Sequence, residues 1–501
     1  MRAAVKKQLA FCLALLLSLT ACAAPADAPP TGDTPAEPVQ TAPEEVPFQL
    51  AVYPAYRLHP VLAENRANLA LSPLLYEPLF ALNERFEAEN VLCRSYSVRE
   101  DGLVWTFELE PGVTFSDGTP LTGEIVAAAL NTARKTGSRY AARLGNIAAV
   151  SGAEGTVTVT LTAPNGALPV LLDIPIALDD SDRPLGTGPY VLTGEGDELS
   201  LVARKAHWRG EALPAREIPL RPVTRSDELI LSFESGDVAL VDVDLMGTNS
   251  LGYSGSYEIW DYATTSMLYL GFNTASGLCR DVRVRRALAL AIDRESITQV
   301  DFARHAAPSS LPVHPDSPLY DRSLAAELAY DPEELMAQIT DLKLEGRSLT
   351  LLVNSENTAR VAAAERIAGQ LHSTGLKVTL EKLAFEDYTA ALEQGKFDLY
   401  LGEVVLTADF DLSPLLLSGA ALNYGRWSDT AVSPLLSLYR ASAGTQRSIN
   451  ARLLYGHLAQ EVPIAPICFK NGCVLTRWGR LSGLEPVRGN VFHHLEGWKI
   501  I

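Results

Sequence analysis

Residues 349–405 have the sequence LTLLVNSENTARVAAAERIAGQLHSTGLKVTLEKLAFEDYTAALEQGKFDLYLGEVV, in which three apolar stretches are separated by two longer, helix-like stretches. The pattern predicts strands at 349–353, 376–381 and 397–405 and helices at 359–373 and 385–394. Each expected helix is followed by a glycine, Gly375 or Gly395, which is typical of a helix C-terminus. Alternating strands and helices with short links predict parallel strands joined by right-handed crossovers. The chain is therefore expected to have an α/β fold.

Two carboxylates follow the third expected strand, in the segment Leu406-Thr407-Ala408-Asp409-Phe410-Asp411. In open parallel sheets, ligands bind beyond the carboxyl ends of the strands. Asp409 and Asp411 are therefore candidate ligand-binding residues. The alternative for Asp409 is a structural role, as a helix cap or a turn residue.

The N-terminus has the features of an export signal. A basic start that includes Lys6 and Lys7 precedes an apolar run over residues 9–19, which is too short to span a bilayer comfortably. The run ends in Leu-Thr-Ala-Cys, which resembles a bacterial lipobox, with cleavage before Cys22 and lipid attached to it. We therefore predict a lipoprotein signal peptide at 1–21 and a protein anchored by lipid to the extracytoplasmic face of the cell membrane. A secretory signal cleaved after Ala-x-Ala is the alternative.

A tether is expected between this anchor and the folded body. Residues 22–47 are rich in Pro and Ala and contain no large aliphatic or aromatic side chain before Val39. Such a segment buries too little apolar surface to fold, so it is predicted to be disordered. The remainder, 48–501, exceeds what one hydrophobic core usually supports, and two or three lobes are expected. It contains no further apolar run of membrane-spanning length.

Charge and motifs exclude several functions. The formal net charge of −18 argues against nucleic acid as a partner, because nucleic acid requires a basic face. The segment 252–256, Gly-Tyr-Ser-Gly-Ser, lacks the second glycine of a nucleophile elbow, and neither a phosphate loop nor a His-Glu-x-x-His motif occurs. We predict neither an enzyme nor catalytic residues. His493 and His494 are the one adjacent histidine pair, and on a strand they would point to opposite faces. No metal or cofactor is predicted.

Four cysteines remain beyond Cys22, namely Cys93, Cys279, Cys468 and Cys473. The last two flank Asn471-Gly472, a dipeptide that is typical of hairpin turns. A disulfide between them and two buried thiols are both compatible with the sequence.

Other elements are predicted by the same patterns. Alternation predicts strands at 104–109 and 156–161, and Thr122 is expected to cap a helix that continues to Ala133. A helix is expected over 281–298, with a solvated arginine-rich face and ion pairs such as Asp281–Arg285.

Several motifs together resemble one family. They are Leu75-Tyr76-Glu77-Pro78-Leu79; residues 101–107 (DGLVWTF) and 111–122 (PGVTFSDGTPLT); Gly186-Thr187-Gly188-Pro189-Tyr190; Phe272-Asn273-Thr274; and residues 281–288 and 291–294. In number, order and spacing they resemble the peptide/nickel-type (family 5) extracellular solute-binding proteins of bacterial ABC importers. The resemblance covers nearly the whole chain after the tether. Asn273 and Arg285, within these motifs, are expected to make structural polar bonds.

The resemblance implies a two-lobe periplasmic-binding-protein-like fold (type II, cluster C-like) with an extra subdomain in the first lobe. The first lobe would comprise 48–265 and 468–501, with the subdomain at about 77–185, and the second lobe 266–467. A small solute, most simply an oligopeptide, would bind between the lobes and favour their closure. The expected partners are that solute and an ABC permease and ATPase complex, and the protein is expected to be a monomer.

The resemblance also assigns binding residues. In peptide-binding members, a carboxylate in the segment matching Asp409–Asp411 pairs with the peptide's N-terminal ammonium. Tyr424 and Trp427 lie in the family's ligand-proximal loop, where they would pack on a ligand or on the core. The segment departs from the family pattern, because the second acid is displaced and Gly402–Val405 replaces an upstream Trp. A nickel chelate or another non-peptide solute is therefore the alternative ligand, and a surface sensor or a hydrolase is a weaker alternative function.

Overall fold

The computed structural model describes residues 48–248 and 250–501, and these residues belong to one compact unit. The predicted signal peptide, the tether and Cys22 lie outside the described residues. No helix in the described part of the chain is long and apolar enough to cross a membrane.

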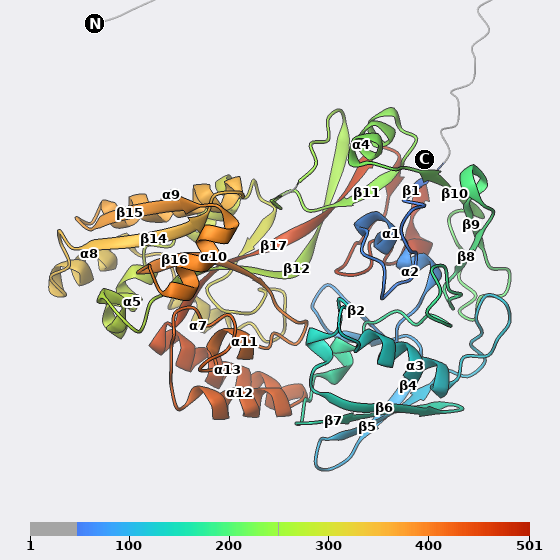
Figure 1. Ribbon diagram of the computed structural model, residues 1–501, viewed down its shortest axis with the longest axis horizontal. Coiled ribbons are helices and arrows are strands. Elements are labelled where there is room, and N and C mark those ends of the chain that lie inside the picture. The colour runs from blue at the N-terminus through green and yellow to red at the C-terminus, as the bar shows by residue number, and fades with distance from the viewer. Residues whose placement is uncertain (1–47, 249) are drawn as a thin grey trace, which may run out of the picture. The chain divides into compact units, whose positions relative to one another are not determined.

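A seven-stranded sheet carries the site. Its order is β11-β17-β12-β16-β14-β15, and β13 also pairs with β17. The strands are β11 (Leu240–Val243), β12 (Tyr257–Phe272), β13 (Ala306–Pro308), β14 (Ser348–Asn354), β15 (Lys377–Leu383), β16 (Leu399–Val405) and β17 (Ile464–Arg477). The two longest strands, β12 and β17, run antiparallel beside each other and connect the β14–β16 end of the sheet to β11 (Figure 1).

The parallel unit expected from residues 349–405 is confirmed. β14 pairs in parallel with both β15 and β16. The connecting helices are α9 (Thr358–His372) and α10 (Phe385–Gln394), close to the predicted bounds. Along β12, Leu268 and Leu270 belong to a buried cluster with α9, whereas Met267 and Tyr269 belong to another with α10. The sheet is therefore buried on both faces here, as parallel sheets require.

The remaining strands form smaller sheets. One has the order β1-β10-β9-β8 and another β4-β5-β7-β6, with two-stranded pairs β2-β3 and β18-β19. Their bounds are β1 (Leu50–Val52), β2 (Phe80–Leu82), β3 (Ala88–Asn90), β4 (Cys93–Val98), β5 (Val104–Leu109), β6 (Ile147–Ala153), β7 (Thr156–Leu161), β8 (Tyr190–Thr193), β9 (Ser200–Ala203), β10 (Glu217–Pro222), β18 (Leu481–Ser482) and β19 (Lys499–Ile500). The predicted strands at 104–109 and 156–161 are thus confirmed.

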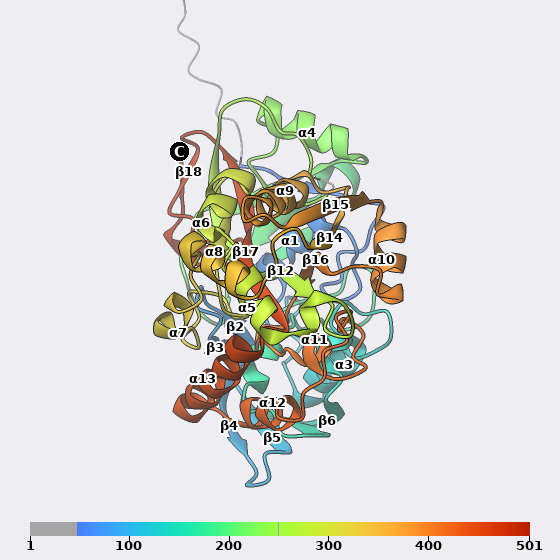
Figure 2. The ribbon, with the colours of Figure 1, turned by 90° about the vertical axis from the view of Figure 1, so that its left-hand side faces the viewer.

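The described chain contains eleven further helices. They are α1 (Arg66–Ala70), α2 (Ser72–Leu75), α3 (Gly123–Ala133), α4 (Ser226–Ser235), α5 (Val282–Ala289), α6 (Arg294–Ser296), α7 (Arg322–Ala326), α8 (Pro332–Asp341), α11 (Ser413–Leu416), α12 (Val432–Ala441) and α13 (Gly444–Glu461). Figure 2 shows α12 and α13 near the sheet of β4–β7. Thr122 caps α3 as expected, its side chain accepting from the amide of Ile125. The sheet of β4–β7 and α3 share a buried cluster of their own within residues 61–176.

The Tyr-Glu-Pro-Leu and Gly-Thr-Gly-Pro-Tyr motifs contact each other. The hydroxyl of Thr187 donates to the buried carboxylate of Glu77 at 2.9 Å, and the amide of Gly188 donates to the carbonyl of Leu75 at 3.0 Å. A Cβ atom on Gly186 would lie 2.0 Å from that same Leu75 carbonyl oxygen. Glycine is therefore required at position 186 by the close approach of two backbone segments.

We expect Gly186→Ala to lower the free energy of unfolding by about 1–3 kcal/mol, because backbone atoms must move to admit the methyl group. Gly369 is the matched control, since a Cβ atom there meets nothing within 4 Å in the middle of α9. Gly369→Ala is expected to raise stability by about 0.5–1 kcal/mol. Urea unfolding of both variants measures the difference, and equal stabilities would contradict the packing argument.

The single helix predicted over 281–298 is wrong. α5 ends at Ala289, α6 begins at Arg294, and a short π-helix follows over Ile297–Asp301. The side chain of Asp293 accepts from the amide of Ser296 at 3.0 Å and from its hydroxyl at 2.6 Å, which starts a new helix. Local side-chain bonds of this kind compete with a continuous helix.

The expected Asp281–Arg285 ion pair is also wrong, because Asp281 pairs with Arg283 at 2.6 Å. Arg285 is only 3 % exposed and donates to main-chain carbonyls, including that of Val462 at 2.9 Å. Asn273 donates to the carbonyl of Phe397 at 2.9 Å. The structural roles expected for Asn273 and Arg285 are therefore confirmed.

The hairpin expected at Asn471-Gly472 does not form. β17 continues through both residues, which pair with Ala263 and Tyr262 of β12. A Cβ atom on Gly472 would lie 2.1 Å from the ring of Tyr262. The glycine therefore makes room for that ring within the strand and does not form a turn. Cys468 and Cys473 stand five residues apart on an extended strand, about 16 Å by its rise, which is too far for a disulfide. All four described cysteines are buried free thiols.

Candidate functional site

A cavity of about 330 Å³ lies between residues 142–171, from the region of the β4–β7 sheet, and residues 404–422, which follow β16. This is the carboxyl end of a parallel strand, where the sequence predicts a ligand. The volume falls within the range of small-molecule sites, which begins at about 300 Å³. Both Asp409 and Asp411 line the cavity.

Asp409 is a buried carboxylate without a cationic partner. The residue is 4 % exposed. Its Oδ1 accepts from the hydroxyl of Thr407 at 2.5 Å, and its Oδ2 accepts from the side-chain amide of Asn165 at 3.2 Å. Arg447 donates at 2.8 Å to the main-chain carbonyl of Asp409. Within residues 48–248 and 250–501, no Lys, Arg or His nitrogen lies within 4.0 Å of the Asp409 carboxylate.

Asp411 is held differently. Its Oδ1 accepts from the amide of Ser413 at 3.0 Å and from the hydroxyl of Ser413 at 2.6 Å. These bonds fix the chain at the start of α11. Asp411 therefore holds a local turn, and the N-cap of α11 is Leu412, which makes no side-chain cap bond.

Cationic groups line the same cavity. Arg143 is 9 % exposed at its side chain and pairs with Asp173 at 2.6 Å. Arg440, at the end of α12, also lines the cavity, and no carboxylate of the described chain lies within 4.0 Å of its guanidinium. Val405, 69 % exposed, adds an apolar side chain at the end of β16. The cavity therefore offers a carboxylate, a guanidinium and an apolar contact.

Tyr424 and Trp427 do not line this cavity and pack in the core of the β12–β16 region. The ring of Tyr424 lies edge-on to Tyr400, with centroids 6.1 Å apart. Trp427 is 5 % exposed, and its ring centroid is 6.5 Å from that of His457. From the sequence we expect these aromatics to pack on a ligand or on the core, and this structure shows them packed on the core. Their role in binding stays a prediction.

Glu403 occupies the segment that departs from the family pattern. Its carboxylate pairs with Lys470 of β17 at 2.7 Å and with Arg360 of α9 at 3.4 Å. Burial would raise the pKa of Glu403, but these two cations hold its pKa below the ordinary value. Lys470 also contacts Asp244, after β11, at 3.2 Å. Glu403 is therefore a charged link within the sheet and, unlike Asp409, is already paired.

Asn165 and Arg440 were missed by sequence reasoning. Asn165 lies 244 residues from Asp409 in the chain, and no local pattern indicates their contact. The turn-like Pro164-Asn165-Gly166 predicts a loop and nothing more. The amide of Gly166 donates to the carbonyl of Arg440 at 2.7 Å, which joins the two walls of the cavity.

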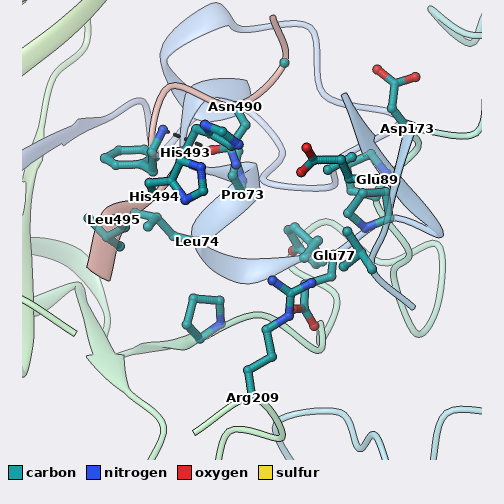
Figure 3. Close-up of a pocket in the computed structure, with 18 of the residues that line it drawn as sticks. Pro73, Leu74, Glu77, Glu89, Asp173, Arg209, Asn490, His493, His494 and Leu495 are labelled. Carbon is teal, nitrogen blue, oxygen red and sulfur yellow. Dashed lines mark hydrogen bonds and ion pairs between the residues drawn. The ribbon is translucent and has the colours of Figure 1, made fainter. Parts of the chain in front are cut away.

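A second cavity, of about 290 Å³, lies among α2, β2, β3 and residues 488–496 (Figure 3). His493 and His494 lie on one side of it, and Glu77 and Glu89 lie across from them. The prediction that the two histidines point to opposite faces of a strand is wrong, because they lie in a turn with ring centroids 3.9 Å apart. Burial lowers the pKa of His493.

Two groups in the described chain bring three potential metal ligands together. One is Glu485, His493 and His494, and the other is Asp261, His305 and Cys473. Neither lines the cavity that contains Asp409.

The seven-stranded sheet, with a ligand-sized cavity beyond the carboxyl end of a parallel strand, fits the two-lobe fold of extracellular solute-binding proteins. Residues 87–421 match the family described as bacterial extracellular solute-binding proteins, family 5, middle part. The chain therefore belongs to this family, whose members deliver solutes to the permease and ATPase of ABC importers.

The chain is similar to a curated relative in sequence and to two solved structures in fold. The glutathione-binding protein GsiB of Salmonella typhi is 27 % identical over 389 residues, which cover 72 % of this chain and 75 % of that protein. The structure of HbpA2 from Haemophilus parasuis matches with a TM-score of 0.75 and 19 % identity, covering 91 % of this chain and 99 % of that one. The ABC transporter substrate-binding protein CtaP of Listeria monocytogenes matches with a TM-score of 0.73 and 20 % identity, covering 90 % and 99 %.

Proposed function

We propose that this protein is the substrate-binding lipoprotein of an ABC importer and that it captures a short peptide by its free N-terminus. In this proposal the peptide ammonium pairs with Asp409. The protein acts as a binder and not as an enzyme, and lipid on Cys22 holds it at the outer face of the membrane. The lobes comprise 48–265 with 468–501, and 266–467, and they close over the peptide.

The observation that carries the proposal is the unpaired charge of Asp409. Burying a carboxylate without a cation is costly, and hydrogen bonds from Thr407 and Asn165 offset only part of that cost. A ligand ammonium in the adjoining cavity would supply the missing positive charge. The proposed ligand therefore completes an ion pair for which the protein provides one half.

The other side of the cavity supports a zwitterionic ligand. Arg440 offers a guanidinium without a carboxylate partner in the described chain, and guanidinium groups bind carboxylates well. A peptide with free ends presents an ammonium and a carboxylate. The volume of about 330 Å³ is near the lower limit for ligand sites and favours a short peptide. The relative GsiB is named for glutathione, which is itself a tripeptide.

Thermal-shift and calorimetric titration with pooled short peptides test the proposal. Free peptides are expected to raise the melting temperature, and the same peptides with an acetylated N-terminus are expected to bind at least about tenfold more weakly, because acetylation removes the ammonium charge. Equal binding of acetylated and free peptides would refute the ammonium contact. Stabilisation by a nickel–histidine chelate or a sugar, with no response to any peptide, would replace the peptide by that class of solute.

A further inference from the structure

A cluster of potential metal ligands lies where β12, β17 and the segment before β13 meet. Asp261 of β12 and Cys473 of β17 are direct partners in the antiparallel ladder. Side chains of directly opposed residues share one face of a sheet. His305 immediately precedes β13, which pairs with β17. Three separate segments of the chain therefore bring an acid, an imidazole and a thiol to one place.

The ligand atoms are close to one another. His305 Nδ1 lies 3.0 Å from both carboxylate oxygens of Asp261, and Cys473 Sγ lies 3.0 Å from Asp261 Oδ1. The distance from Cys473 Sγ to His305 Nδ1 is 3.8 Å. Tetrahedral zinc with ordinary bond lengths to O, N and S places its ligand atoms about 3.4–3.6 Å apart. Shifts of about half an ångström or less would therefore fit the cluster around one ion.

The surroundings hold these side chains in position. The main-chain amide of His305 donates to Phe302 at 2.7 Å, and the His305 carbonyl accepts from the Asn471 amide at 3.0 Å. The Asn471 side chain donates to Asp261 Oδ2 at 3.3 Å. Contacts of this kind orient metal ligands. Cys473 is buried, whereas the side chain of Asp261 is 32 % exposed, so one side of the cluster remains open to solvent.

The same geometry does not suit a cysteine nucleophile. In such a site one nitrogen of the histidine accepts the thiol proton while the other is oriented by the acid. Here Nδ1 faces both the thiol and the carboxylate. A cation bound at the centre of the cluster would contact all three groups at once. In a thiol–imidazole catalytic pair, the thiol and the acid would instead contact different nitrogens of the histidine.

We propose that Asp261, His305 and Cys473 form a binding site for a zinc-class divalent cation, with a fourth position open to water. Thiolate and imidazole ligands favour such ions over Mg²⁺ or Ca²⁺. The site is separate from the Asp409 cavity, and it does not depend on the identity of the transported solute. On the predicted lobe boundaries, Asp261 and Cys473 belong to the first lobe and His305 to the second, so the ion would link the two.

Cobalt titration of the purified, tag-free and chelator-stripped protein tests the site. Co²⁺ bound by a thiolate gives a ligand-to-metal charge-transfer band in the near ultraviolet. We expect this band to saturate at one ion per chain, and we expect calorimetry to show zinc binding with the same stoichiometry. Absence of the band together with absence of zinc binding would overturn the proposal.

Variants assign the ion to these residues. Cys473→Ser should abolish the band, and Asp261→Asn and His305→Gln should each weaken zinc binding by at least about tenfold. Cys93→Ser is the matched control, since Cys93 is another buried thiol whose sulfur donates to the Ser95 carbonyl. Unchanged zinc affinity in both Asp261→Asn and His305→Gln would refute the site, as would loss of binding in His493→Ala alone. Melting temperatures of the ion-free variants show whether they fold.

Discussion

Asp409→Asn is expected to weaken binding of free-N-terminus peptides by about 30- to 1,000-fold. This range corresponds to about 2–4 kcal/mol, as found when one partner of a buried charge pair is removed. Asparagine has nearly the same shape as aspartate and keeps a carbonyl oxygen for Thr407 or Asn165. The loss would therefore fall on the ligand contact. Titration calorimetry with a peptide identified in the thermal-shift screen measures it.

The stability of the free Asp409→Asn protein should be unchanged or higher, because the substitution removes a buried charge that has no cation beside it. Asp331→Asn is the matched control: Asp331 caps α8 at the surface, and asparagine caps helices equally well. This control should bind peptide normally. Wild-type affinity in Asp409→Asn, with the fold intact, would remove Asp409 from the site and leave the family assignment untouched.

Arg285→Met is expected to lower the free energy of unfolding by about 3–5 kcal/mol. The Arg285 guanidinium donates to the carbonyls of Glu461 and Val462 at the end of α13 and to that of Cys279 before α5. Methionine fills much of the volume but leaves these buried acceptors without a donor. The substitution therefore removes the hydrogen bonds that join two segments 176 residues apart in the chain.

Urea unfolding measures the loss, with Arg283→Met as control. Arg283 is 69 % exposed at its side chain and pairs only with its neighbour Asp281, so its replacement should cost less than about 1 kcal/mol. Equal effects of the two substitutions would contradict the role of Arg285 in joining α5 to α13.

Local patterns explain which parts of this fold could be predicted. The strands and helices of 349–405 follow from apolar periodicity and from glycines that end helices. Their order and their parallel pairing could therefore be predicted from the sequence. The position of Asp409 at a strand end follows from the same pattern. The family motifs supplied the two-lobe arrangement.

Long-range contacts explain what could not be predicted. The Asn165–Asp409 bond and the approach of Gly166 to Arg440 depend on how distant segments pack. Gly472 has the sequence of a turn, but its lack of a side chain admits the ring of Tyr262. The break before Arg294 arises because the side chain of Asp293 caps a new helix. In the sequence this single capping residue is a weaker signal than the helical pattern around it.

The order of the seven-stranded sheet also constrains how the chain can fold during its synthesis or export. β17 lies between β11 and β12, although about two hundred residues separate it from either strand in sequence. Until residues 464–477 are available, β11 has no neighbour in this sheet and one edge of β12 stays unpaired. Closing such long loops is slow relative to forming local contacts. The centre of the sheet thus forms late, and a chain interrupted before β17 would expose an unpaired strand edge to aggregation or proteolysis.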